Sequence, residues 1–207
     1  MNLLRRVLFV VTAGVFASRV IAADVPSDVA AVAARIEQPA MLRGEFEQQK
    51  QIAGFRKPLL SRGRFVLARG QGVIWDTEQP FPSRLTVTAH RLRATSGGSV
   101  REIDAATEPA LRAINRVLFD LLAGDLRDLQ EGFEIRVLRI DAGGWRLQLS
   151  PRAGVFAQVF STIELEGDRH VAHVVLAEAN GDRSDIRFSA MTTSPAMDAK
   201  ERADLAH

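Results

Sequence analysis

The side chains that could perform acid–base, nucleophilic or metal chemistry are few in this sequence. The 207 residues include four histidines and neither cysteine nor tyrosine. His170 and His173 are spaced like a pair of metal ligands, but residues three apart in a strand point to opposite faces, so we do not expect them to share a metal. No serine stands in a G-x-S-x-G elbow. The residue types therefore favour neither a catalytic site nor a metal site.

Acidic residues are plentiful, but their spacing is that of a protein surface. Glu45, Glu47, Glu164 and Glu166 lie on the polar faces of strand-like segments, where solvated carboxylates are the ordinary case. A pair of carboxylates for glycoside hydrolysis stays open, because the distance between them is a tertiary property. The Gly70-Gln71-Gly72 segment lacks the third glycine of a dinucleotide-binding loop and does not open a helix, so it predicts a turn and no cofactor.

Alternation of apolar and polar residues predicts that most of the chain forms strands. Leu42, Gly44, Phe46 and Gln48 alternate with charged or polar residues, as in a half-buried strand. The same alternation recurs at Phe65 and Leu67, Leu85 and Val87, Phe133 to Val137, Trp145 to Leu149, and Val159 to Leu165. Turn signals separate these segments at residues 141–144, 166–168 and 180–182. Nine to eleven such segments predict an antiparallel meander that forms a large curved sheet or barrel.

Two segments have helical spacing instead. A capped amphipathic helix is expected from Ser27 to a point near Pro39. A second helix is expected from Thr107 to Gly124, with a wide apolar face that must cover something, and the concave face of the sheet is the natural candidate. This face consists of Leu111, Ile114, Leu118 and Leu121. The polar residues 195–207 predict a loose helix or a disordered tail.

The first 22 residues have the layout of a secretory signal peptide. Arg5 and Arg6 precede an apolar run, and small residues lead to Ala22. Removal of this segment reduces the 27 basic residues to 24, against 25 acidic residues. This balance, without a long basic block, gives no electrostatic footprint for nucleic acid. The absence of cysteine excludes a lipid-modified N-terminal cysteine, so we expect a periplasmic monomer with only transient membrane contact.

One stretch is more specific than these patterns. It contains Gly63-Arg64-Phe65, Arg69, Trp75, Gln79-Pro80 and Leu85 without gaps in the spacing. This stretch resembles the LolA family of periplasmic outer-membrane lipoprotein carriers. Phe46-x-Gln48 is similar to the first strand of the family, and Leu149-Ser150-Pro151-Arg152 and the segments on either side of residues 180–182, ending at Ile186 and Phe188, resemble its C-terminal half.

The resemblance implies a mainly β fold with helices (α+β), in which an incomplete antiparallel β-barrel carries a helical lid over an apolar cavity. It implies one carrier domain over residues 23–194 that holds the acyl chains of a lipoprotein or another lipid, and that meets an inner-membrane donor complex and an outer-membrane acceptor. Arg69 takes the position of a residue that influences lid opening in the family. The residues expected to line the cavity and lid are Phe46, Phe65, Leu67, Trp75, Leu85, Val87, Leu111, Ile114, Leu118 and Leu121.

Two other functions stay open at this point. A non-transporting binding or assembly module of the cell envelope would keep the sheet but fill its interior. A periplasmic hydrolase would need a histidine or carboxylate that points into the cavity beside a nucleophile. His90 is the histidine near the specific stretch. A hydrolase predicts that His90 points into the cavity, whereas a carrier does not require this.

Overall fold

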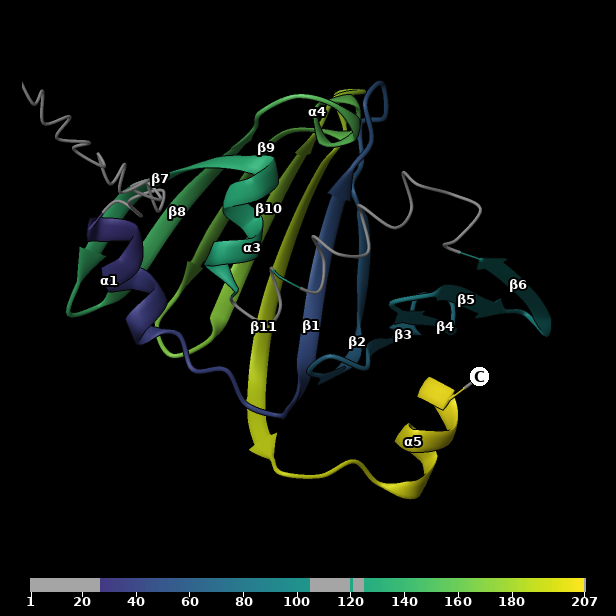
Figure 1. Cartoon of the computed structure of the whole chain (residues 1–207). Helices are drawn as coiled ribbons and strands as arrows, with labels where there is room; N and C mark the ends of the chain where they lie inside the picture. Colours follow the sequence, from purple (N-terminus) through teal and green to yellow (C-terminus); the bar gives the residue numbers. More distant parts are fainter. Residues whose placement is uncertain (1–26, 105–119, 121–124, 207) are drawn as a thin grey trace, which may run out of the picture.

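The protein is built around one large antiparallel sheet that curves strongly (Figure 1). The computed structural model describes residues 27–104, 120 and 125–206. Within these residues the sheet has eleven strands in the order β6-β5-β4-β3-β2-β1-β11-β10-β9-β8-β7. The strands β6 and β7 form its two edges, so the sheet is not closed. The predicted incomplete barrel and the upper end of the predicted strand number are confirmed.

The strands have these bounds: β1 (Met41–Gln51), β2 (Leu59–Ala68), β3 (Gly72–Gln79), β4 (Ser83–Thr88), β5 (Arg91–Ser96), β6 (Ser99–Asp104), β7 (Phe133–Asp141), β8 (Gly144–Pro151), β9 (Phe160–Gly167), β10 (Val171–Glu178) and β11 (Arg183–Ser194). Strands that are neighbours in sequence pair with each other, except for β6 and β7, and β1 pairs with β11. The N-terminal and C-terminal meanders therefore meet along a single seam between β1 and β11.

The predicted alternation decides which face of β1 is buried. Leu42 and Phe46 are buried in the main core, whereas Glu45 and Glu47 are exposed. Antiparallel partners that lie opposite each other share a face of the sheet, so Phe188 of β11, opposite Phe46, extends the apolar face. We call this the concave face.

The predicted turns stand between the strands. The strand β2 ends at Ala68 and β3 begins at Gly72, and the amide of Gln71 donates to the carbonyl of Ala68 at 3.0 Å. Gly70 has φ +69°, a conformation that glycine adopts without steric cost. The turns at residues 141–144, 166–168 and 180–182 likewise connect β7 to β8, β9 to β10 and β10 to β11.

Four helices accompany the sheet in the described residues: α1 (Ser27–Arg35), α3 (Leu126–Gly132), α4 (Val155–Val159) and α5 (Ala199–Ala206). The first has the predicted buried positions Val29, Val32 and Ile36. It ends at Arg35 and not near Pro39, because proline disfavours helical conformation in the residue before it. The helix predicted over 107–124, with Leu111, Ile114, Leu118 and Leu121, and the predicted signal peptide lie outside the described residues.

The two terminal helices pack across the seam, each on the strands of the other half. The helix α1 contacts β7, and α5 contacts β3 and β4. The tail expected to be loose is therefore partly ordered: Arg43 of β1 donates twice to Glu201, with both distances 2.6 Å. Arg84 of β4 bonds Asp204 at 2.7 Å, and both arginines lie on the convex face.

Candidate functional site

Aromatic rings form the centre of the concave face where the two halves meet. Phe46 of β1 stacks on Trp75 of β3, with ring centroids 3.9 Å apart. Phe188 of β11 meets Phe65 edge-on at 5.1 Å and Trp75 at 6.0 Å. Rings from four strands thus form one rigid apolar floor, since aromatic pairs at these distances attract beyond their buried area.

Six predicted cavity residues fall within the described chain, and all six lie on this face. Phe46, Phe65 and Leu67 belong to the main buried cluster, and Trp75 packs against it half-buried. The others are Leu85, half-buried opposite Trp75, and Val87, buried opposite Val73. The four predicted lid residues Leu111, Ile114, Leu118 and Leu121 lie outside the described residues.

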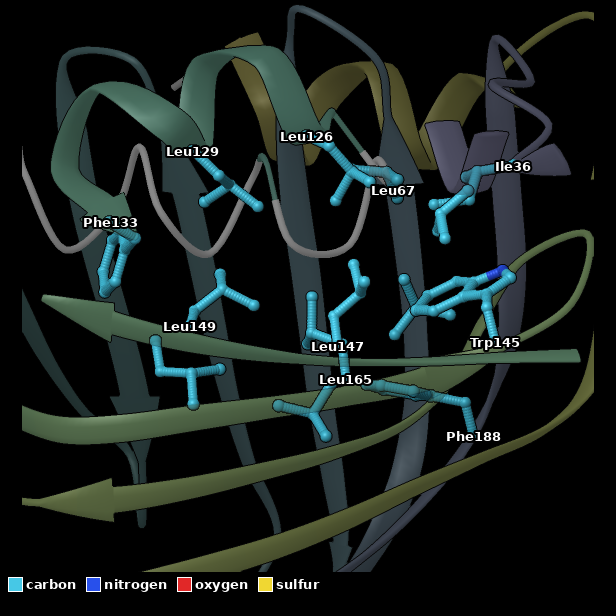
Figure 2. Close-up of a cluster of buried hydrophobic side chains, with 14 of the residues drawn as sticks. Ile36, Leu67, Leu126, Leu129, Phe133, Trp145, Leu147, Leu149, Leu165 and Phe188 are labelled. Atoms are coloured by element: carbon cyan, nitrogen blue, oxygen red, sulfur yellow. The ribbon is translucent and has the colours of Figure 1, made fainter. Parts of the chain in front are cut away.

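A short helix that was not predicted covers the other half of the concave face. Figure 2 shows Leu126 and Leu129 pointing from α3 toward the sheet, where Leu147, Leu149 and Leu165 lie. All five side chains are buried. The carboxylate of Asp125 caps the helix by accepting from the amide of Arg127 at 3.3 Å. Aspartate followed by leucines three apart was the local signal that could have predicted this helix.

A cleft of 590 Å³ lies between α1 and α3. Its lining contains more apolar than polar residues. The lining residues are Val29, Ala30, Ala33, Ala34, Ile36, Gln38, Asp125, Leu126, Arg127 and Gln130. Its volume falls within the range of about 300–1,000 Å³ that is usual for sites of small molecules. Val29, Ile36 and Leu126 also belong to the main buried cluster, so part of the wall of the cleft is formed by side chains of the core.

Arg69 stands at the corner between β2 and β3, close to this cleft. Its Nη1 donates to Oε1 of Gln38 at 2.6 Å, and Gln38 lines the cleft. Its Nε and Nη2 are buried and have no hydrogen-bond partner among the residues that the structure describes. A buried donor without a partner costs about 1–3 kcal/mol, so this corner is held in an arrangement that leaves part of the guanidinium unsatisfied.

The charged end of α1 fixes one end of the site. Arg35 donates to the carbonyl of Asp141 and to the carboxylate of Asp168, both at 2.5 Å. The indole Nε1 of the fully buried Trp145 donates to the carbonyl of Asp168 at 2.7 Å. The helix is thereby bound to the β7–β8 and β9–β10 turns, which keeps one wall of the cleft in place.

The three histidines in the described residues do not converge on the concave face. His173 lies on the convex face, 2.9 Å from Asp185 and 3.5 Å from Glu166. His170 precedes β10 and lies 3.8 Å from Glu37. His90, the residue that a hydrolase would need inside the cavity, is exposed between β4 and β5. The observed arrangement of these imidazoles gives no support to the hydrolase.

Charges on the convex face are paired with one another. Burial alone would raise the pKa of Glu166, but a hydrogen bond from Arg146 and the charges of Arg146 and His173 hold that pKa below its usual range. Arg146 lies 2.7 Å from the carboxylate. The convex face is charged at this point, whereas the concave face carries the apolar side chains of the main buried cluster.

An open antiparallel sheet with an apolar concave face under helices defines a class of proteins that enclose apolar groups. The sequence matches the family described as outer membrane lipoprotein carrier protein LolA over residues 37–201. Because this match spans most of the chain, the protein belongs to the LolA family, as the resemblance indicated. A comparison with curated protein sequences finds no match. In the described residues, no helix is long and apolar enough to cross a membrane.

Solved structures with similar folds share little sequence with this chain. A LolA superfamily protein of Nitrosomonas europaea has a TM-score of 0.45 and 9% identity, over 83% of this chain and 94% of that one. MucB in the MucA/MucB complex of Pseudomonas aeruginosa has a TM-score of 0.47 and 16% identity, over 84% and 59%. The lipoprotein LppX of Mycobacterium tuberculosis has a TM-score of 0.40 and 8% identity, over 82% and 99%.

Proposed function

We propose that the protein is a periplasmic carrier that holds the acyl chains of a lipoprotein or another lipid between α1, α3 and the concave face, and transfers them toward the outer membrane. In this proposal residues 1–22 direct export, and an inner-membrane donor complex and an outer-membrane acceptor are the partners. The observation that carries it is the cleft of 590 Å³ between α1 and α3, whose lining includes Val29, Ile36 and Leu126 of the main buried cluster.

The energies of such a ligand suit a carrier. Burial of a myristoyl-length chain yields on the order of 10 kcal/mol, at about 0.8 kcal/mol per CH₂. Association costs about 4–15 kcal/mol in lost freedom of motion. The small surplus permits transfer to a slightly more apolar receiver without nucleotide hydrolysis.

The site residues have distinct roles in this proposal. The aromatic floor of Phe46, Phe65 and Trp75, with Leu67, Leu85 and Val87, does not line the cleft itself and contacts the acyl chain once the chain passes from the cleft onto the concave face. Arg69 controls access, because its corner borders the cleft and its guanidinium lacks partners for two of its nitrogens. Leu111, Ile114, Leu118 and Leu121 complete the cover as a lid.

Filling the cleft tests the carrier directly. Ala33 of α1 lines the cleft, whereas Ala31 on the same helix is exposed and does not line it. We expect Ala33→Trp to prevent ligand binding, because the indole takes the space of the acyl chain, and Ala31→Trp to leave it unchanged. The measurement is native mass spectrometry of protein purified without detergent from a Gram-negative periplasm.

The wild-type protein and Ala31→Trp should carry an acylated species that Ala33→Trp has lost, while all three keep the same unfolding midpoint. A wild-type protein that is empty, and that also fails to take up a fluorescent fatty acid, would rule out the carrier. That result would leave a non-transporting assembly module with a filled interior.

A further inference from the structure

Large apolar side chains are exposed at one end of the sheet, outside the concave face. Among the described residues, Phe55 is 67% exposed, Leu59 59%, Leu60 63% and Phe81 79%. The first three belong to residues 52–62, which connect β1 to β2 and begin β2, and Phe81 belongs to residues 79–82 between β3 and β4. We call these two segments the docking loops. Exposed apolar groups gathered in this way commonly mark a binding surface.

The two docking loops lie side by side. Arg62 of β2 is opposite Gln79 of β3, and its Nε donates to the Oε1 of that glutamine at 2.8 Å. A cleft of 480 Å³ is lined by Leu60 and Arg62 from one loop and by Gln79 and Pro80 from the other. Leu60 of the first loop and Pro80 of the second therefore belong to one surface.

The first docking loop is held in place by hydrogen bonds. The amide of Phe55 donates to the carbonyl of Ile52 at 3.0 Å, and the amide of Ala53 donates to Asp182 at 2.9 Å. The backbone amide of Ala53 also lowers the pKa of Asp182, which keeps that acceptor charged. The loop extends beyond the end of the sheet at the top of Figure 1. Its exposed side chains are thus presented outward on an ordered support.

The charge of the first docking loop points to the chemistry of its partner. Residues 52–63 contain Arg56, Lys57 and Arg62 and no acidic residue. The guanidinium of Arg62 donates to the neutral amide of Gln79, and the carboxylates nearest to it in the cleft, Glu47 and Asp185, belong to the strands β1 and β11 and not to the loop. Aromatic and leucine side chains beside lysine and arginine suit the interface of a bilayer, where the apolar groups enter the acyl boundary and the cations meet anionic headgroups.

We propose that the docking loops bind the surface of an anionic phospholipid bilayer. The loop projects and carries single apolar side chains between cations. Such a loop suits a lipid surface, because lipid molecules can rearrange around each inserted side chain. The cleft between α1 and α3 is formed by other elements, so the inference does not depend on what the concave face holds.

Vesicle flotation tests the docking loops. The mature protein is mixed with vesicles of phosphatidylethanolamine and phosphatidylglycerol, or of phosphatidylcholine alone. We expect binding to the anionic vesicles that weakens with added salt. The double variants Phe55→Ser/Leu60→Ser and Arg56→Glu/Lys57→Glu should bind the anionic vesicles at least about tenfold more weakly than the wild-type protein. Val100→Ser is the matched control, because Val100 of β6 is 55% exposed and belongs to neither docking loop.

Fatty-acid uptake separates this inference from the carrier function. The loop variants should keep uptake and the wild-type unfolding midpoint while they lose vesicle binding. Equal binding of wild type to neutral and anionic vesicles, or equal binding by the loop variants and Val100→Ser, would overturn the inference. Absence of vesicle binding together with self-association that Phe55→Ser/Leu60→Ser abolishes would overturn it too, and would assign the surface to a second copy of the chain.

Discussion

At the scale of single residues, Gly63 explains why the most specific stretch of the sequence begins with glycine. A Cβ atom at this position would lie 1.8 Å from the backbone carbonyl oxygen of Asp76. The register between β2 and β3 shifts between Arg62 and Gly63, and the two backbones approach closely there. The stretch that indicated the family therefore begins with glycine because β2 and β3 approach closely at this position, and a larger residue would prevent that approach.

Arg69 allows a test at the same scale. Arg69→Met keeps an unbranched apolar stem and removes the two buried donors that lack partners. We expect exchange of a fluorescent fatty acid to slow by about tenfold, because the observed corner then no longer carries about 1–3 kcal/mol of unsatisfied hydrogen bonding. Stopped-flow fluorescence measures the rate.

Arg64→Met is the control, because Arg64 lies on β2, the strand that precedes the Arg69 corner, and is ion-paired with Glu78 on the convex face. Unchanged exchange in Arg69→Met, or equal slowing in both variants, would remove Arg69 from the control of access.

The floor of the site could be predicted residue by residue only where it depended on local alternation. Phe46 and Phe65 follow from the two-residue period of their own strands, whereas Trp75 follows from the resemblance to the LolA family. Phe188 shares the same aromatic cluster, but its place depends on the pairing of β1 with β11. Such long-range register is not written in any one segment of the sequence.

At the scale of elements, the helix α5 shows how charges can fix a segment that has no strong apolar face. The hydrogen bond from Arg43 holds the pKa of Glu201 below its usual range, although burial opposes this. The same bond raises the pKa of Arg43. The partners of α5 lie on β1, β3 and β4, far away in sequence, so the composition of residues 195–207 could not reveal that they dock.

The docking of α5 should depend on pH in one direction. A carboxyl whose pKa is lowered by folding stabilises the folded state above its unfolded pKa of about 4.3, and this stabilisation is lost as pH falls through the lower folded value. We expect urea unfolding midpoints of the wild-type protein to decrease below about pH 4.

Glu201→Gln should lose about 1–3 kcal/mol near neutral pH and lack its part of the acid dependence. Glu45→Gln is the control, because Glu45 is an exposed residue of β1. Identical pH profiles of wild type and Glu201→Gln would show that α5 does not depend on this pair.

Helices near the concave face were harder to predict than strands. The helix α1 follows from its apolar spacing, but α3 has only seven residues and two inward leucines. A period of 3.6 residues needs a longer segment to stand out, so short covering helices are recognised from their caps or not at all.

At the scale of the whole molecule, counting alternating segments predicted a large curved sheet or barrel, because each strand and turn carries its own local signal, and the resemblance to the family predicted that the barrel is incomplete. Net charge, by contrast, averaged away a local feature. The balanced total conceals a basic loop whose exposed phenylalanine and leucines lie within a few residues of one another. Surfaces formed by single loops must be sought segment by segment.

The exchange of terminal helices across the β1–β11 seam has a consequence for how the molecule can be divided. Each half contributes a strand to the shared seam and a helix to the surface of the other half. We therefore expect residues 23–104 and 125–207, expressed together as separate polypeptides, to assemble and copurify. Size-exclusion chromatography of the pair measures this, with Arg43→Glu as a variant that disturbs both β1 and its contact with α5. Fragments that stay apart would mean that the covalent connection is required. If they assemble, the two fragments of this LolA fold can serve as a complementation system, in which assembly of the fold shows that the two fragments have met.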